Sequence, residues 1–193
     1  MINNFSSAVL KWYKENGRAN LPWKNKDPYK IWISEIMLQQ TQVKTVIPYY
    51  SKFIKKYPTL ERLSTAKYDE LMLLWSGLGY YRRLDNIYKS VRIIMNKHSG
   101  VFPNNYDDIL SLPGIGRTTA SAIYTFSEFG SKAILDGNVK RIILRFFNIS
   151  KNIKKSYLEE SLWSKSTLLT PLGKNTSNFI QGMMDIGSII CTR

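Results

Sequence analysis

Two carboxylates in this sequence occupy positions where acid–base chemistry is possible. Glu35 lies in segment 31–38, where six of the eight residues are apolar, so a helix here is expected to be buried nearly all round. Asp136 follows the apolar run 133–135, at an expected helix start. Because burial raises the pKa of a carboxyl group, Glu35 has the property of a general acid that works near neutral pH. The alternatives are a Glu35 held by a salt bridge or a cap, and an Asp136 that is an ordinary N-cap.

A turn with two glycines predicts a phosphate site. Residues 112–120 read LPGIGRTTA, which is typical of a short helix, a tight turn and a second helix of small residues. Glycine lets the backbone approach a phosphate closely, and a helix N-terminus presents N–H groups and a positive dipole end. Such groups bind DNA phosphates without reading the base. A plain turn between two packed helices is the alternative; the residues concerned are Gly114, Gly116, Arg117 and Thr118.

Two further segments have residues suited to a nucleic-acid duplex. Residues 77–83 read GLGYYRR, so an exposed Tyr80 could wedge between bases while Arg82 and Arg83 hold phosphates. A helix C-cap followed by core tyrosines is the alternative. The polar segment from Gln39 to Gln42 could cap the helix before it, or present amide donors and acceptors to a duplex.

The elements that position these residues are helices. Apolar residues recur at helical spacing, and Asp27-Pro28 combines a capping side chain with a proline suited to a first turn. No alternating strand pattern and no hairpin dipeptide stands out, so the sequence predicts an all-α fold. The expected helices lie near residues 5–13, 28–39, 46–54, 68–75, 84–95, 107–111, 117–127, 138–147, 155–168 and 176–190.

Composition narrows the class of partner. The 193 residues include 28 Lys and Arg against 14 Asp and Glu, and 28 − 14 gives a net charge of +14. This favours a polyanion such as nucleic acid, although a solubility shell is the alternative. Cys191 is the only cysteine and His98 the only histidine, so neither a disulfide framework nor a Cys-only or His-rich metal site is expected within the chain. With no signal peptide and no apolar run of about 18 residues, a soluble cytoplasmic protein without a membrane partner is expected.

Four segments, in this order, resemble those of the helix-hairpin-helix DNA glycosylase superfamily, and most closely the MutY-type adenine DNA glycosylases. They are SEIMLQQTQV (34–43), GLGYYRR (77–83), LPGIGRTTA (112–120) and LDGNVKR (135–141). The first and the last are far more specific than the hairpin itself. The resemblance runs from about residue 21 to residue 192, which is nearly the whole chain.

The resemblance implies base excision repair of double-stranded DNA that holds adenine opposite 8-oxoguanine or guanine. The adenine is flipped into a pocket, Glu35 gives a proton to its N7, and the glycosidic bond breaks toward an oxocarbenium ion at C1′. Asp136 stabilises that ion, or bonds to the sugar transiently, before water adds. Asn138 is implied to orient Asp136 or the water. Gln181 is implied to contact adenine.

The resemblance also assigns the remaining contacts. Gln40 and Tyr80 are implied to fill or wedge the base stack around the 8-oxoguanine. At position 118, relatives of the endonuclease III type carry a lysine that attacks C1′ as an amine. Thr118 offers no amine, so the resemblance implies a monofunctional hydrolase. A bifunctional lyase and a catalytically impaired DNA-binding remnant stay open as alternatives.

The family's cofactor is in question. The resemblance makes Cys191 the first of four cysteine ligands of a [4Fe-4S] cluster, and the other three are missing from this sequence. Cluster assembly in this chain is therefore not expected. A C-terminal domain for 8-oxoguanine recognition is also missing, so the chain is expected to be either a fragment or a shortened protein.

The resemblance implies two lobes. One is a six-helix barrel over 22–132, with the helix-hairpin-helix at about 107–127. The other combines 1–21 with 133–193. A monomer is expected, in a bacterial cytoplasm and associated with the nucleoid through DNA.

Overall fold

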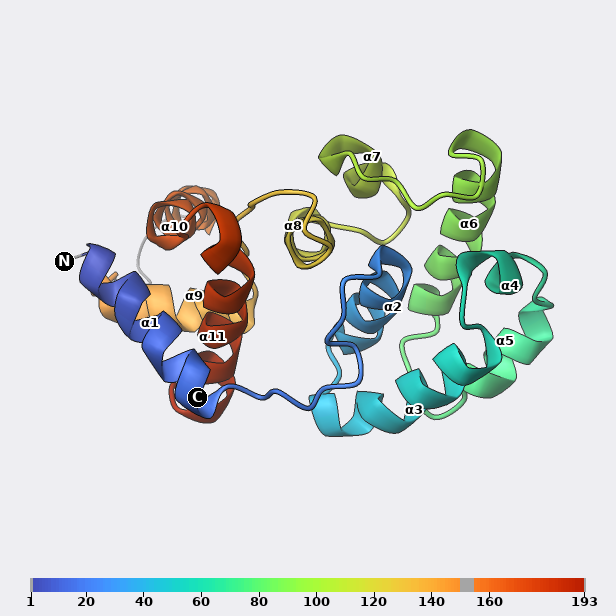
Figure 1. Ribbon diagram of the computed structural model, residues 1–193, viewed down its shortest axis with the longest axis horizontal. Helices are drawn as coiled ribbons and strands as arrows, with labels where there is room; N and C mark the ends of the chain where they lie inside the picture. Colours follow the sequence, from blue (N-terminus) through green and yellow to red (C-terminus); the bar gives the residue numbers. More distant parts are fainter. Residues whose placement is uncertain (1, 150–154, 193) are drawn as a thin grey trace. The chain divides into compact units, whose positions relative to one another are not determined.

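The computed structural model describes residues 2–149 and 155–192, and within these ranges it contains helices and no strand (Figure 1). The all-α prediction is confirmed. The helices are α1 (Ile2–Asn16), α2 (Pro28–Leu38), α3 (Val43–Lys56), α4 (Leu60–Ser64), α5 (Tyr68–Trp75), α6 (Arg82–Lys97), α7 (Tyr106–Ser111), α8 (Arg117–Phe126), α9 (Gly137–Phe146), α10 (Lys155–Leu169) and α11 (Thr176–Ile189), with a 3₁₀ turn at Gly173–Asn175.

Helix α4 is the one described helix that the sequence did not predict. It has only five residues, too few for an apolar stripe to recur. Its start is fixed locally, since Oγ1 of Thr59 accepts a hydrogen bond from the backbone N–H of Arg62 at 3.2 Å. Leu60 and Leu63 are buried beneath it. Whether so short a capped helix forms depends on the packing of its apolar side chains against the core.

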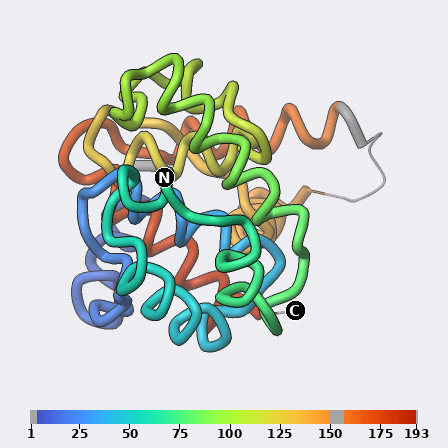
Figure 2. The backbone as a smooth tube through the Cα atoms, turned by 90° about the vertical axis from the view of Figure 1, so that its right-hand side faces the viewer, coloured from blue at the N-terminus to red at the C-terminus, as the bar shows by residue number. Residues whose placement is uncertain are grey.

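The chain forms two compact units. The middle unit comprises Asn20–Phe129, and the terminal unit combines Met1–Ala19 with Gly130–Arg193. Helices α2 to α8 belong to the middle unit, whose path can be followed from blue through cyan to yellow in Figure 2. Helices α1, α9, α10 and α11 belong to the terminal unit.

Helix α2 is the centre of the middle unit, with contacts to α3, α6 and α8. Its N-terminus is capped by Asp27, whose Oδ1 accepts from the backbone N–H of Tyr29 at 3.0 Å. Trp32 and Ile33 are completely buried in it, and Ile36 and Met37 almost so. Each such side chain contributes about 1.5–3 kcal/mol by leaving water. This packing fixes the rotation of α2, and with it the direction of every other side chain on the helix.

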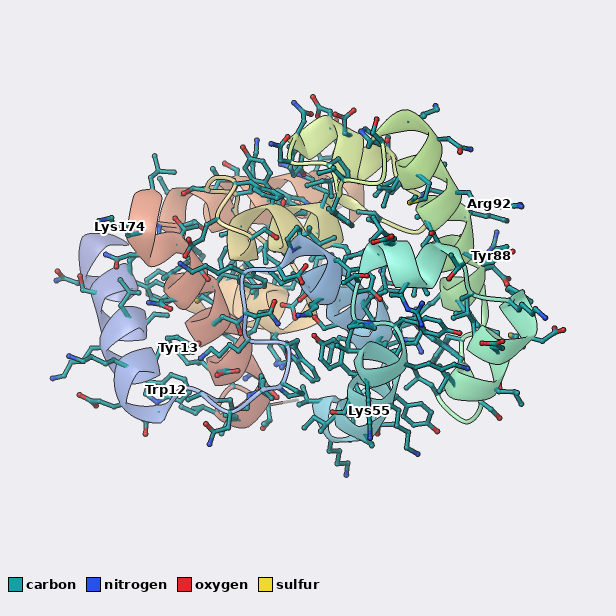
Figure 3. All side chains as sticks on the ribbon, turned by 45° about the vertical axis from the view of Figure 1, so that its right-hand side comes forward. Trp12, Tyr13, Lys55, Tyr88, Arg92 and Lys174 are labelled. Atoms are coloured by element: carbon teal, nitrogen blue, oxygen red, sulfur yellow. The ribbon has the colours of Figure 1, made fainter. Side chains whose placement is uncertain are left out.

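In the terminal unit, α11 packs closely against α1 and α9 at positions where α11 has glycines. A Cβ added at Gly182 would lie 2.9 Å from Cγ1 of Val9 in α1. One added at Gly187 would lie 2.5 Å from Cβ of Asn138, at the start of α9. Tyr13, buried on α1 and labelled in Figure 3, also packs against Gly182. The backbone of α11 can therefore approach both helices.

An ion pair between partly exposed Arg18 and buried Asp185 joins the end of the N-terminal segment to α11. Asp185 is 1% exposed, and its Oδ1 accepts from Nε of Arg18 at 2.7 Å and from Nη2 at 2.5 Å. Its Oδ2 accepts from the backbone N–H of Arg18 at 2.9 Å. A buried carboxylate needs such partners to offset its desolvation. Over the described residues, no helix is both long enough and apolar enough to cross a membrane.

Candidate functional site

Asp136 is the N-cap of α9, as the simpler alternative expected, but it makes more bonds than a cap needs. Its Oδ1 accepts from the backbone N–H of Asn138 at 3.0 Å and of Val139 at 2.8 Å. Its Oδ2 accepts from the side-chain amide of Asn138 at 3.0 Å. Burial raises the pKa of Asp136, while these hydrogen bonds and the nearby Arg141 oppose the rise. The result is a partly buried carboxylate with fixed orientation and little hydration.

Asn138 is held in turn by Arg141. The side-chain oxygen of Asn138 accepts from Nη2 of Arg141 at 2.9 Å. Because a guanidinium can only donate, the amide oxygen must face Arg141 and the amide nitrogen must face Asp136. Arg141 also donates to the backbone carbonyls of Gly187 and Cys191. These bonds connect the end of α11 to the orientation of the Asp136 carboxylate.

Sequence reasoning did not single out Arg141 as part of this arrangement. The signal was present, because Arg141 stands three residues after Asn138 in a helix, where side chains share a face. Its tertiary acceptors, the carbonyls of Gly187 on α11 and of Cys191 just after it, could not be read from the sequence. Asp136, Asn138 and Arg141 are called the Asp136 network below.

Glu35 is more exposed to solvent than the sequence predicted. The helix around it is buried as predicted, but Glu35 itself keeps partial solvent exposure between Ser34 and Ile36, which are both 1% exposed. The rotation of α2 that buries Trp32 and Met37 leaves Glu35 on the one partly open strip of this segment. Glu35 belongs to the middle unit, and the Asp136 network belongs to the terminal unit.

Gln40 and Tyr80 both lie in exposed loops and have unusual backbone conformations. Gln40 follows the end of α2 with φ +57°, and Tyr80 precedes α6 with φ +50°. Non-glycine residues rarely adopt this left-handed region, and where they do the surrounding structure must enforce it. Tyr80 is 57% exposed. The structure therefore presents both predicted wedge residues to solvent.

The two arginines after this tyrosine have different environments. Arg82 is exposed at the start of α6, so it stays a candidate for phosphate contact. Arg83 is 6% exposed, and its guanidinium donates to backbone carbonyls inside the middle unit. The interpretation that both arginines hold phosphates is therefore wrong for Arg83.

The hairpin between α7 and α8 is anchored from behind. Leu112 and Ile115 are buried, and Ser90 on α6 donates to the carbonyl of Pro113 at 3.3 Å. Gly114 has φ +78°, and a Cβ there would lie 2.5 Å from Nδ2 of Asn86, so only glycine suits this position.

Gly116 is the N-cap of α8 and brings no side chain to its first amides. Within the part of the chain that the structure describes, the backbone N–H groups of Gly114 and Gly116 donate to no backbone carbonyl. This is the arrangement expected of a phosphate site. Exposed Arg117 and partly buried Thr118 occupy the first turn of α8.

The remaining predicted residues lie on or near α11. Gln181 is partly buried on that helix, and Cys191 follows it. The Cys191 sulfur accepts from Nη1 of Arg145 at 2.9 Å. Among the described residues, no three His, Cys, Asp or Glu side chains gather closely enough to hold a metal ion. A single thiol does not supply the ligands of a four-cysteine cluster, so these residues do not fit that cofactor.

The sequence and the fold both match known DNA repair proteins. The model of the HhH-GPD superfamily of base excision DNA repair proteins matches residues 33–167. The chain is 53% identical over 188 residues to the adenine DNA glycosylase of Buchnera aphidicola subsp. Acyrthosiphon pisum, covering 97% of this chain and 53% of that protein. It is 34% identical over 201 residues to the adenine DNA glycosylase of Mus musculus, covering 99% of this chain and 39% of that protein. The chain thus spans about half the length of the bacterial relative.

Solved structures share the fold. A thermostable thymine-DNA glycosylase superposes with a TM-score of 0.89 at 31% identity, covering 99% of this chain and 88% of that one. An endonuclease III bound non-covalently to DNA superposes with a TM-score of 0.80 at 20% identity, covering 99% and 86%. The second likeness shows the fold alone.

Proposed function

This chain belongs to the HhH-GPD superfamily of base excision DNA repair proteins, and we propose that it hydrolyses the N-glycosidic bond of adenine mispaired with 8-oxoguanine or guanine in double-stranded DNA. The Asp136 network is the observation that carries the proposal. Its carboxylate is oriented by three N–H donors, and burial raises its pKa. Identity of 53% to an adenine DNA glycosylase supports adenine as the base.

Asp136 acts on the sugar. As the bond between C1′ and N9 lengthens, its electron pair moves to the base and positive charge develops at C1′. A carboxylate that is already oriented stabilises this charge without reorganisation, and reduced hydration strengthens the attraction. Asn138 keeps Oδ2 in place, and Arg141 keeps Asn138 in place.

Glu35 acts on the base. In this proposal its acid form gives a proton to adenine N7, so that adenine leaves as a neutral molecule. Water then adds to C1′ and loses a proton, which restores the acid. Gln181 contacts the adenine. The partial exposure of Glu35 gives the proton a route to solvent.

The DNA is held by the middle unit. The backbone amides of Gly114 and Gly116, which donate to no backbone carbonyl, bind a phosphate together with Arg117 and Thr118 in the first turn of α8. Exposed Arg82 neutralises a second phosphate. Gln40 and Tyr80 enter the base stack where the adenine leaves it. We further propose that the protein acts as a monomer on chromosomal DNA in a bacterial cytoplasm.

The products distinguish this activity from its alternatives. A duplex with A opposite 8-oxoguanine is incubated with excess protein, and the released base is identified by mass. We expect adenine and an intact abasic strand that breaks only after alkali. Release of thymine from a T·G duplex, without adenine release, would favour the activity named for the thermostable relative instead. Strand breaks without alkali would favour a lyase, and release of neither base would overturn the proposal.

A further inference from the structure

Arg83 connects two loops that lie about 40 residues apart in the sequence. Its Nη1 donates to the carbonyls of Met37 and Gln39, each at 2.6 Å, at the C-terminal end of α2. Its Nη2 donates to the carbonyl of Gly79 at 3.0 Å. Gln39 immediately precedes Gln40, and Gly79 immediately precedes Tyr80. One guanidinium thus bonds to the residues that precede Gln40 and Tyr80, both of which are exposed and left-handed.

Aromatic rings complete the enclosure of this guanidinium. Its Cζ lies 5.6 Å from the ring centroid of Trp75 and 5.2 Å from that of Tyr80. Trp75 also donates from Nε1 to the Gly79 carbonyl at 3.1 Å, so this carbonyl accepts from two side chains. The ring of Tyr80 therefore packs against the guanidinium of Arg83, although Tyr80 is more than half exposed to solvent.

The chemistry of this site explains why the residue is an arginine. Within the described residues, no carboxylate pairs with Arg83. Its charge faces the carbonyl end of α2, which carries a partial negative charge, and the ring faces of Trp75 and Tyr80. A planar guanidinium donates in several fixed directions at once, whereas a lysine ammonium acts as a compact point charge. An arginine can therefore hold two backbone segments in a fixed relation.

We propose that Arg83 is a positioning residue that holds Gln40 and Tyr80 together, before DNA arrives, in the conformation that enters the duplex. The inference rests on the proposed function, which places Gln40 and Tyr80 in the base stack. Because Gln40 and Tyr80 already hold these left-handed conformations in the free protein, displacing the adenine does not have to order them. The entropic cost of ordering them then belongs to folding and not to DNA binding. Arg83 itself touches neither base nor phosphate, because it is buried and its Nη atoms already donate to backbone carbonyls.

A double-mutant cycle tests whether Arg83 acts through Tyr80. The variants are Arg83→Lys, Tyr80→Ala and their combination, and the measurement is the fluorescence rise of 2-aminopurine placed beside the target adenine. We expect each single change to slow this rise by about tenfold, equivalent to about 1.4 kcal/mol of barrier. The combination should be no more than about twofold slower than the slower single variant. Effects that multiply would overturn the proposal.

Arg92→Lys is the matched control, because Arg92 lies exposed on the same helix, beside Tyr88 (Figure 3). It should give the wild-type rate. A purely structural role for Arg83 predicts a lower urea midpoint for Arg83→Lys, with rate effects that multiply with those of Tyr80→Ala. Coupling to Tyr80 therefore separates positioning from stability.

Hydrogen exchange gives a second test that needs neither DNA nor a change at Arg83. Tyr80→Ala removes the ring from the guanidinium at an exposed position, so the variant should fold. We expect faster exchange of the amides at 39–42 as well as those at 77–81. Faster exchange confined to 77–81 would overturn the coupling of the loops. If the loops are coupled but the wild type releases no adenine, then the proposed function fails and the role of Arg83 in holding the two loops remains.

Discussion

The side-chain amide of Asn138 donates to Oδ2 of Asp136 at 3.0 Å. This bond fixes the position of the second carboxylate oxygen of an aspartate that also caps a helix. A capping carboxylate needs only one oxygen for the helix, and Oδ1 already accepts two backbone N–H groups. The second oxygen is therefore oriented by a side chain that the helix does not require. This difference from an ordinary cap is the basis for the first prediction.

Asp136→Asn and Glu35→Gln should each slow adenine release by at least about 100-fold while duplex affinity changes little. In the proposed mechanism both residues act as charge develops in the transition state, whereas the contacts proposed to bind DNA are backbone amides and Lys or Arg side chains. Single-turnover release from an A·8-oxoguanine duplex measures the rate. Asp27→Asn, which alters the cap of α2 in the same way, should keep the wild-type rate. A variant within about tenfold of wild type would exclude its residue from catalysis.

The raised pKa of Asp136 predicts how stability depends on pH. Burial makes the folded protein keep the Asp136 proton to a higher pH than the unfolded chain does. The contribution of this group to stability is therefore complete below its unfolded pKa and is lost as pH rises through its folded pKa. Asp136→Asn removes this loss but keeps a good capping residue. Urea unfolding from about pH 4 to pH 7 should favour the variant increasingly over wild type; a difference that is constant with pH would contradict the assignment.

Alanine substitutions at Gly187 and Gly137 are expected to change the stability of the protein in opposite directions. A Cβ at Gly187 would lie 2.5 Å from Cβ of Asn138, whereas one at Gly137 has nothing within 4 Å. Gly187→Ala should destabilise the protein by about 1–3 kcal/mol through overpacking. Gly137→Ala should stabilise it by up to about 1 kcal/mol, because alanine favours a helix. Thermal unfolding distinguishes the two; equal effects would mean that α11 does not approach α9 closely.

DNA affinity should fall steeply with salt. If about five phosphates are neutralised, log K should decrease with log salt at a slope of about −4 to −5. Arg82→Met should make that slope shallower by about 0.9, since Arg82 is exposed and is proposed to contact one phosphate. Fluorescence anisotropy between about 50 and 200 mM salt provides the measurement. A wild-type slope near zero would show that the net charge of +14 serves another purpose.

Thr118→Lys should introduce an amine that borohydride traps on the abasic sugar. A hydroxyl cannot form an imine, so the wild type should trap little. At position 118 the new amine would lie in the first turn of α8 next to Arg117, where positive charge favours its neutral form. Gel analysis after reduction shows the covalent product. Efficient trapping by the wild type would show that another lysine is the nucleophile and would favour the lyase alternative.

Local sequence signals predicted most of the helices and the cap at Asp136. A capping carboxylate binds N–H groups two and three residues ahead, so the cap depends on its immediate neighbours alone. The hairpin helices at α7 and α8 were also predicted from their own residues, with bounds close to those observed. Helix α4 was missed because a five-residue helix has no periodic pattern.

The sequence by itself determined which residues are charged, which glycines occupy the hairpin turn, and where most helices begin. Only the tertiary structure decided that Arg82 faces solvent while Arg83 is buried among the carbonyls of Met37, Gln39 and Gly79. It also decided that Arg141 reaches α11, and that Glu35 keeps partial contact with water. Adjacent residues on a helix point about 100° apart. Which of them meets the core depends on the packing of segments far away in the chain, and no local pattern records it.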